Sequence, residues 1–183
     1  MKVVVITGSG RRRGTSSYLA DEFIRGCIEN DNEVFRFDSA FMKVNPCIGC
    51  NKCRKEGICC WKDDFQILVP HLLAADEVVF VTPVYYMCMT AQLKMTIDRM
   101  YQLEKTDGFR GAKKYIVLSS AWDCDESVFD PLMNTVKNFC KFLRWNYEGA
   151  VLAAGVDARE EIEKTSYGRD AYELGRQDRK SVV

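Results

Sequence analysis

The stretch that decides the fold is Gly8-Ser9-Gly10-Arg11-Arg12-Arg13-Gly14-Thr15-Ser16-Ser17. It follows the apolar run 3–6, which is typical of a buried strand, and precedes apolar residues at helical spacing over 15–29. A helix N-terminus presents unpaired backbone N–H groups and the positive end of a dipole, so it attracts anions. The glycines let the backbone come close to a ligand. We expect this loop to hold a phosphate through the residues Ser9, Arg11, Arg13, Gly14, Thr15 and Ser16.

The alternative for this loop is an ordinary strand-to-helix turn with a solvated basic run. Its spacing matches neither G-x-x-x-x-G-K-[ST] nor G-x-G-x-x-G. The sequence therefore argues against a nucleoside-triphosphate loop and against a standard dinucleotide loop.

Composition limits the classes of protein to which the chain can belong. Its 183 residues suit one domain with a substantial core, and 47% hydrophobic with 28% charged residues is ordinary for a globular protein. A formal net charge of zero suggests neither nucleic acid nor a membrane surface as a partner. No apolar run reaches the length of a membrane span and no signal-peptide pattern opens the chain, so we expect a cytoplasmic location.

Hydrophobic periodicity predicts alternating strands and helices. We expect strands over 2–7, 33–38, 78–81, 114–119 and 147–153, and helices over 15–29, 64–75, 91–101, 125–143 and 157–177, with the last residues frayed. This alternation predicts a single α/β domain over 1–183, a doubly wound five-stranded parallel sheet in the order 2-1-3-4-5. A cysteine-rich loop, 40–63, is inserted after the second strand.

The predicted strand order places three unusual loops together. Ligands of such sheets bind at the carboxyl ends of the strands, where the chain reverses direction. Loops 8–17, 82–90 and 119–124 lie there, and the second is apolar and aromatic. A phosphate site beside an apolar wall suits a flat heterocycle with one phosphate, such as flavin mononucleotide (FMN). The alternative for Tyr85, Tyr86 and Trp122 is ordinary, partly buried aromatic side chains.

Three motifs together resemble the flavodoxin-like flavin reductases, which include NADPH-dependent FMN reductases, quinone reductases and iron–sulfur flavoproteins. They are the loop 8–19, Pro83-Val84-Tyr85 with the helix after it, and the cysteine segment 47–64. The resemblance covers most of the chain to about residue 156. Gly10, Arg13, Thr15 and Met87 depart from the usual family residues.

The resemblance implies a flavodoxin-like fold and non-covalently bound FMN. It places the ring along Pro83, Val84, Tyr85, Tyr86, Met87, Ser119, Ser120 and Ala121. It also implies a homo-oligomer, a dimer or tetramer, with loops 40–62 and 82–90 as the candidate interface.

Four cysteines form the compact spacing Cys47-x2-Cys50-x2-Cys53-x5-Cys59. Four thiolates can hold a [4Fe–4S] cluster or tetrahedral zinc, and some flavin reductases keep such thiols without metal. The resemblance to iron–sulfur flavoproteins points to a cluster, and Cys60 is a spare that can replace Cys59. Cys27 and Cys140 lie on apolar helix faces and are predicted to be core residues.

We therefore expect an FMN-dependent oxidoreductase that passes electrons from NAD(P)H, or a protein donor, to a small acceptor such as a quinone or free flavin. Because the cofactor carries the chemistry, no side chain is assigned as acid, base or nucleophile. One alternative is an iron–sulfur flavoprotein that carries electrons between protein partners such as ferredoxin. Another is a zinc-stabilised nucleotide-binding module without redox activity.

Overall fold

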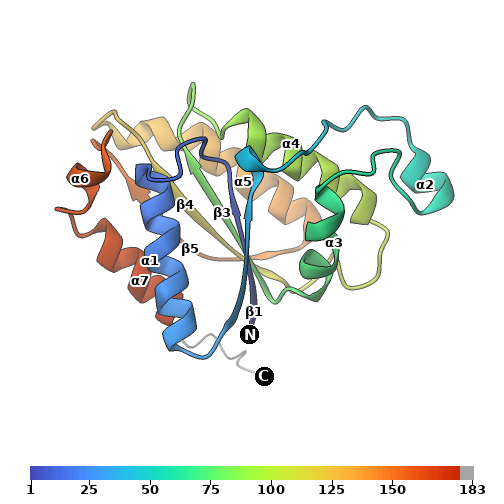
Figure 1. Ribbon diagram of the computed structural model, residues 1–183, viewed down its shortest axis with the longest axis horizontal. Helices are drawn as coiled ribbons and strands as arrows, with labels where there is room; N and C mark the ends of the chain where they lie inside the picture. Colours follow the sequence, from blue (N-terminus) through green and yellow to red (C-terminus); the bar gives the residue numbers. More distant parts are fainter. Residues whose placement is uncertain (178–183) are drawn as a thin grey trace.

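Five parallel strands form one sheet in the computed structural model of the protein, which describes residues 1–177 (Figure 1). The strands are β1 (Lys2–Thr7), β2 (Glu33–Asp38), β3 (Glu77–Pro83), β4 (Lys114–Ser120) and β5 (Asn146–Ala153). Their order, β2-β1-β3-β4-β5, and the parallel pairing of every neighbour confirm the predicted doubly wound sheet. The prediction that the last residues fray lies outside the described residues.

Helices cover both faces of the sheet. Figure 1 shows α1 and α7 on one side and α3, α4 and α5 on the other. The α-helices are α1 (Thr15–Glu29), α2 (Lys52–Glu56), α3 (Phe65–Ala74), α4 (Ala91–Arg99), α5 (Asp130–Leu143), α6 (Arg159–Ile162) and α7 (Tyr167–Arg176). Three short 3₁₀ helices are η1 (Ser39–Phe41), η2 (Met100–Leu103) and η3 (Glu126–Phe129). Among residues 1–177, none of these helices combines the length and apolar character that crossing a membrane requires.

The core has two halves, one on each face of the sheet. In a strand, successive side chains point to opposite faces. Val4 and Ile6 of β1 accordingly pack with the α3, α4 and α5 side, whereas Val3 and Val5 pack with the α1 and α7 side. β1, β3 and β4 are buried almost throughout, because helices cover them on both sides. The predicted core residues Cys27 and Cys140 are both buried.

The C-terminal helical region differs from the prediction. Residues 157–177 form two helices, α6 and α7, where we expected one. At the break, the Thr165 hydroxyl donates to the Ile162 carbonyl over 2.7 Å and accepts from the Tyr167 backbone N–H over 3.3 Å. A threonine side chain that bonds to neighbouring backbone competes with helix continuation. The second helix can then turn to pack on α1, where Gly168 lies against Tyr18.

The loops at the carboxyl ends of the strands are joined by backbone hydrogen bonds. Gly8 N–H donates to Val81 carbonyl over 2.8 Å, which joins the β1 loop to β3. Val84 N–H donates to Ser120 carbonyl over 2.8 Å, which joins the β3 loop to β4. The sheet thus continues into the loops and fixes their positions relative to one another.

Candidate functional site

A cavity of about 120 Å³ lies at the carboxyl edge of the sheet, at the switch between β1 and β3. Residues from the β1, β3, β4 and β5 loops line it. They are Ser9, Arg11, Gly14, Thr15, Ser16, Pro83, Val84, Tyr85, Ser120, Ala121, Trp122, Val156 and Asp157. The three loops expected to meet do meet here.

The β1–α1 loop is held in shape by its own hydrogen bonds. Gly14 N–H donates to the Arg11 carbonyl over 3.1 Å, and Arg11 N–H donates to the Ser9 hydroxyl over 3.1 Å. The Ser17 hydroxyl also donates to the Arg11 carbonyl, over 3.0 Å. A Cβ at Gly14 would lie 3.1 Å from Arg11 Cβ, so a larger residue would crowd this turn. The loop is therefore preorganised.

The first turn of α1 presents free donors to the cavity. Gly14 is the residue before the helix, and no side chain caps the backbone N–H groups of the turn. Thr15 Oγ1 and Ser120 Oγ lie 2.8 Å apart and share one hydrogen bond, so the hydroxyl that accepts it keeps its own O–H to donate. Ser16 Oγ is buried and has no hydrogen-bond partner among the described residues. Since a buried polar group without a partner costs free energy, this hydroxyl fits a ligand that accepts a hydrogen bond here.

The three arginines of the loop have different surroundings. The guanidinium of Arg11 lines the cavity and lies 3.5 Å from the Asp157 carboxylate in an exposed ion pair. Arg12 stacks over the Phe41 ring at 3.9 Å from its centroid. Arg13 is exposed and is not among the residues that line the cavity. Of these three cations, Arg11 is the one placed beside an incoming anion.

A second part of the cavity wall comes from β3, β4 and the loops that follow them. Pro83, Val84, Tyr85, Ser120 and Ala121 line the cavity. Their backbone groups and apolar side chains form one side of it.

Ser119 lies outside this wall. It is fully buried, and its hydroxyl donates to the Thr82 carbonyl over 2.8 Å. In this structure, then, Ser119 joins β4 to β3 and does not line the cavity.

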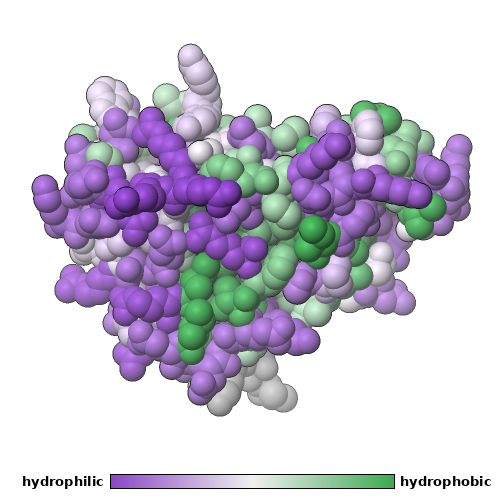
Figure 2. Space-filling model, in the orientation of Figure 1, coloured by the Kyte–Doolittle hydropathy of each residue, from purple (hydrophilic) through white to green (hydrophobic). Residues whose placement is uncertain are grey.

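A tight turn carries the remaining predicted ring contacts away from the cavity. Tyr85 and Cys88 exchange backbone hydrogen bonds of 2.8 and 3.1 Å, so Tyr86 and Met87 form a two-residue hairpin loop. Their φ angles of +46° and +62° correspond to a type I′ turn, which usually holds Asn or Gly. The β3–α4 loop projects from the surface in Figures 1 and 2, and the side chain of Tyr86 is fully exposed.

The start of α4 is fixed directly against the β1–α1 loop. The Thr90 hydroxyl donates to the Gly8 carbonyl over 2.8 Å and accepts from Leu93 N–H at the helix N-terminus. A Cβ at Gly8 would lie 2.3 Å from Thr90 Oγ1 and 2.7 Å from Leu93 Cβ. Only glycine allows this approach, which fixes the spacing between the two loops.

Three lining residues are absent from the predicted set: Trp122, Val156 and Asp157. Trp122 belongs to the expected loop 119–124 and is largely exposed. Val156 and Asp157 follow β5, and Val156 N–H donates to the Ala121 carbonyl over 2.9 Å. No sequence motif indicates Val156 and Asp157. They could have been predicted from their place after a strand, because parallel strands end at one edge of the sheet and ligands bind there.

The cysteine loop contains a second, much smaller cavity of about 20 Å³. Its lining includes Cys47, Cys50, Cys53, Cys59 and Cys60, together with Arg99 of α4. The sulfur atoms of Cys50 and Cys60 lie 3.5 Å apart. The backbone N–H of Lys52, and then the thiol of Cys60, lower the pKa of Cys50, which favours its thiolate. The structure thus gathers the four predicted cysteines, with Cys60, around one space.

The spacing of these thiols bears on which metal group they suit. Tetrahedral zinc lies about 2.3 Å from each of four sulfurs, so those sulfurs must approach one another closely. Among residues 1–177, no three His, Cys, Asp or Glu side chains are placed to hold a single metal ion. Thiolates are the donors that both zinc and iron–sulfur clusters take, so the chemistry of the donor set suits either group.

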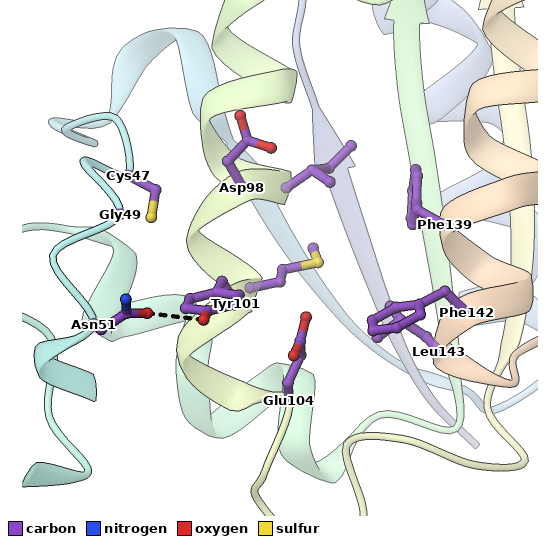
Figure 3. A pocket seen from close by; sticks show the side chains of 11 residues that line it. Cys47, Gly49, Asn51, Asp98, Tyr101, Glu104, Phe139, Phe142 and Leu143 are labelled. Atoms are coloured by element: carbon purple, nitrogen blue, oxygen red, sulfur yellow. Dashed lines mark hydrogen bonds between the residues drawn. The ribbon is translucent and has the colours of Figure 1, made fainter. Parts of the chain in front are cut away.

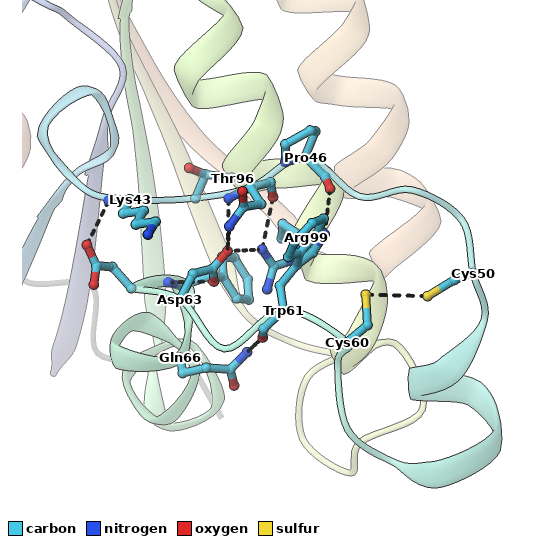
Figure 4. A network of polar contacts seen from close by, with 12 residues as sticks. Lys43, Pro46, Cys50, Cys60, Trp61, Asp63, Gln66, Thr96 and Arg99 are labelled. Carbon is cyan, nitrogen blue, oxygen red and sulfur yellow. Dashed lines mark hydrogen bonds and ion pairs between the residues drawn. The ribbon is translucent and has the colours of Figure 1, made fainter.

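Two aspartates hold the ends of the cysteine loop together (Figure 4). Asp63 accepts from Asn45 backbone N–H over 2.8 Å, and Asp64 accepts from Lys43 N–H over 2.7 Å. The buried guanidinium of Arg99 lies 2.7 Å from Asp63 Oδ2 and 2.9 Å from the Asn45 carbonyl. The loop is therefore anchored on α4 at its base.

A third cavity, of about 610 Å³, lies between the α4–η2 segment and α5, beside the cysteine loop (Figure 3). Its apolar lining includes Met100, Tyr101, Phe139 and Phe142. The Tyr101 hydroxyl donates to Asn51 of the loop over 2.9 Å. The two carboxylates of the lining, Asp98 and Glu104, are already ion-paired, with Lys94 and Arg54 respectively. The surface that remains is therefore mostly apolar.

The architecture and the loops at the switch point define a flavodoxin-like protein. Two solved structures share the fold. An NAD(P)H:quinone oxidoreductase from Methanothermobacter marburgensis superposes with a TM-score of 0.70 at 19% identity, over 95% of this chain and 94% of that one. An FMN-dependent NADH-azoreductase from Bacillus anthracis, in complex with FMN, gives a TM-score of 0.69 at 14% identity, over 96% and 98% of the two chains.

The chain belongs to the NADPH-dependent FMN reductase family, whose model matches residues 1–128. An iron–sulfur flavoprotein of Methanocaldococcus jannaschii is 38% identical over 99 residues, which cover 54% of this chain and 51% of that protein. An iron–sulfur flavoprotein of Archaeoglobus fulgidus is 37% identical over 100 residues, 55% of this chain and 46% of that protein. The matched region thus spans about half the length of these relatives.

Proposed function

We propose that the protein binds FMN at the carboxyl edge of its sheet and passes electrons from NAD(P)H to a small acceptor such as a quinone or free flavin. The observation that carries this proposal is the buried, unpartnered hydroxyl of Ser16 at the N-terminus of α1. A phosphate would accept hydrogen bonds from this hydroxyl and from the free N–H groups of the turn. Family membership supports FMN as the ligand that brings this phosphate.

The residues that would hold FMN divide into two groups. Ser9, Arg11, Thr15 and Ser16 would bind its phosphate. Pro83, Val84, Tyr85, Ser120 and Ala121 would border its ring, with Trp122 in addition. FMN supplies the electron-transfer chemistry when bound, and the protein positions it and sets its electrostatic surroundings.

Two of the side chains that would border the ring, Tyr85 and Trp122, are exposed to solvent. Tyr86 and Met87, in the turn beside the cavity, are exposed as well. A flat acceptor therefore has access to one face of a ring held here. Apolar side chains gathered around such a site also support burial in an assembly.

We propose a homo-oligomer in which loops 40–62 and 82–90 meet a second copy of the chain. The exposed Tyr86 and the apolar cavity beside the cysteine loop support this arrangement. Sedimentation equilibrium of the full chain tests it. Tyr86→Ser should shift the protein towards monomer, whereas Tyr147→Ser, an exposed tyrosine on the edge strand β5, should not. A monomeric wild-type protein would contradict the proposal.

A second candidate function is that of an iron–sulfur flavoprotein, which carries electrons between protein partners such as ferredoxin. The cavity lined by five thiols favours it. We propose that Cys47, Cys50, Cys53 and Cys59 would hold one [4Fe–4S] cluster, which takes four thiolates. Cys60 can replace one of them, since it lies 3.5 Å from Cys50. The cluster would supply one-electron transfer when present.

The test is the visible absorption spectrum of anaerobically purified protein, followed by rapid mixing with NADPH. A flavin spectrum that bleaches fast with NADPH supports the reductase. Flavin with additional broad absorbance, iron and sulfide, and slow bleaching by NADPH but fast bleaching by reduced ferredoxin, supports the carrier. If no flavin is bound, even after FMN is added, both proposals are wrong.

A further inference from the structure

The guanidinium of Arg99 is an unusual group in the wall of the thiol cavity. Its side chain is 1% exposed, and it belongs to the last turn of α4. Burial of a cation is costly unless the cation is paired and hydrogen-bonded. The arginine must therefore be stabilised by what surrounds it.

Only one side of this guanidinium is satisfied. Nη1 donates to Asp63 Oδ2 over 2.7 Å and to the Asn45 carbonyl over 2.9 Å, both at the base of the cysteine loop. Nε and Nη2 are buried and have no hydrogen-bond partner among the described residues. Arg99 also lines the cavity that contains the five thiols. Nη1 of Arg99 therefore holds the base of the cysteine loop in place. Nε and Nη2 are left without an acceptor, in a side chain that borders the thiol cavity.

Cys59 is one of the five cysteines whose side chains surround the cavity that Arg99 borders.

From these observations we infer that Arg99 is a positioning residue for the thiol site: its free N–H groups donate to sulfur there and stabilise negative charge on the metal centre. The inference rests on the proposed cluster. Four thiolates give such a cluster a net negative charge, and reduction adds one more electron. Hydrogen bonds to sulfur and nearby positive charge stabilise the reduced form, so they raise the reduction potential.

Arg99→Lys separates this role from the structural one. Lysine keeps the positive charge and can still pair with Asp63, but it lacks the planar group that donates in two directions. We expect reduction to become at least tenfold less favourable, a fall in potential of about 59 mV for one electron. Arg36→Lys is the control, because Arg36 is likewise an arginine paired with aspartate, with Asp21 and Asp38, but lies on β2.

The measurement is a mediated redox titration of the purified holoprotein, followed by electron paramagnetic resonance of the reduced cluster. Iron and sulfide are determined first. If the wild-type protein contains neither, the proposed cluster is wrong and the inference falls with it. If the cluster is present and Arg99→Lys leaves its potential unchanged, the inference alone is wrong.

A second variant keeps the test decisive if Arg99→Lys does not fold. Asp63→Asn combined with Arg99→Gln replaces both partners of the buried pair by neutral groups, which folded proteins tolerate better than removal of one partner. Its cluster should show a potential lowered by at least as much as in Arg99→Lys. An unchanged potential in this double variant would equally overturn the inference.

Discussion

Ser16 is the residue whose substitution most directly tests the proposed flavin site. Its buried hydroxyl lacks a partner, so Ser16→Ala should leave the free protein equally stable or slightly more stable. FMN binding should weaken about tenfold or more, because a hydrogen bond to a charged group contributes about 1.5–3 kcal/mol. Calorimetric titration with FMN and thermal unfolding of the free protein measure the two effects.

Ser39→Ala is the matched control for this substitution. Ser39 is also buried, but its hydroxyl accepts from Thr96 over 2.9 Å, away from the cavity. It should lower stability and leave FMN affinity unchanged. Equal FMN affinity of Ser16→Ala and wild type would show that the phosphate does not reach this hydroxyl.

The carboxylate of Asp157 should weaken phosphate binding, because it repels a phosphate and already pairs with the guanidinium of Arg11. The two side chains are 66% and 70% exposed, so the ion pair itself contributes little, about 0.2–1 kcal/mol. Asp157→Asn should free Arg11 and tighten FMN binding about two- to fivefold. The gain should shrink as salt is added. Fluorescence titration at two salt concentrations checks this, with the distant Asp170→Asn on α7 as control. Weaker binding by Asp157→Asn would contradict the expected repulsion.

At the scale of the elements, the β1–α1 loop packs against α4 at Gly8 but not at Gly10, so substitution of these two glycines should have unequal effects on stability. Gly8→Ala would place a methyl group 2.3 Å from Thr90 Oγ1, so α4 must move. Overpacking of this kind costs about 1–3 kcal/mol. At Gly10 nothing lies within 4 Å of an added Cβ, and Gly10→Ala should be nearly neutral. Denaturant unfolding of both variants measures the difference, and equal stabilities would refute the close packing.

The strand order could be predicted because each central strand is an apolar run and the connections between the strands are helical. Residues 78–81 are buried on both faces, as that pattern indicates. The boundaries of α6 and α7 could not be predicted, since the break between them depends on a local hydrogen bond of Thr165 and on packing against α1. The spacing of apolar residues along the sequence indicates neither this hydrogen bond nor this packing.

For the candidate site as well, the sequence predicts which loops meet but not where each of their side chains lies. The meeting of loops 8–17, 82–90 and 119–124 follows from topology alone. The outward position of Tyr86 and Met87 does not, because the positive φ angles of a type I′ turn are expected at Asn or Gly and not at these residues. Likewise, the sequence marks the cysteines, but only folding brings Arg99 to them.

At the scale of the whole molecule, the Asp63 carboxylate that anchors the cysteine loop should make the free energy of unfolding depend on pH. Burial raises the pKa of Asp63, but hydrogen bonds from Arg99 and Asn45 lower it more, to about 2. Because the folded-state pKa lies below the unfolded value near 3.9, this stabilisation is complete at neutral pH. It is lost as pH falls from about 4 through 2.

The loss from this one carboxylate should reach about 2–3 kcal/mol. Urea unfolding between pH 7 and pH 2 measures it, and Asp63→Asn should remove this part of the pH dependence. If the wild-type and Asp63→Asn proteins lose stability in parallel between pH 4 and pH 2, the aspartate does not have the depressed pKa.

The separation of the two cavities has a consequence for how the protein matures. Within the described part of the chain, no residue lines both the cavity at the carboxyl edge of the sheet and the cavity of the thiols. The walls of each are complete without the other, since one belongs to the strand edge and the other to a loop closed by its own aspartates. A cofactor bound at one place would therefore contact none of the residues that line the other, and we expect each place to take up its cofactor whether or not the other is filled.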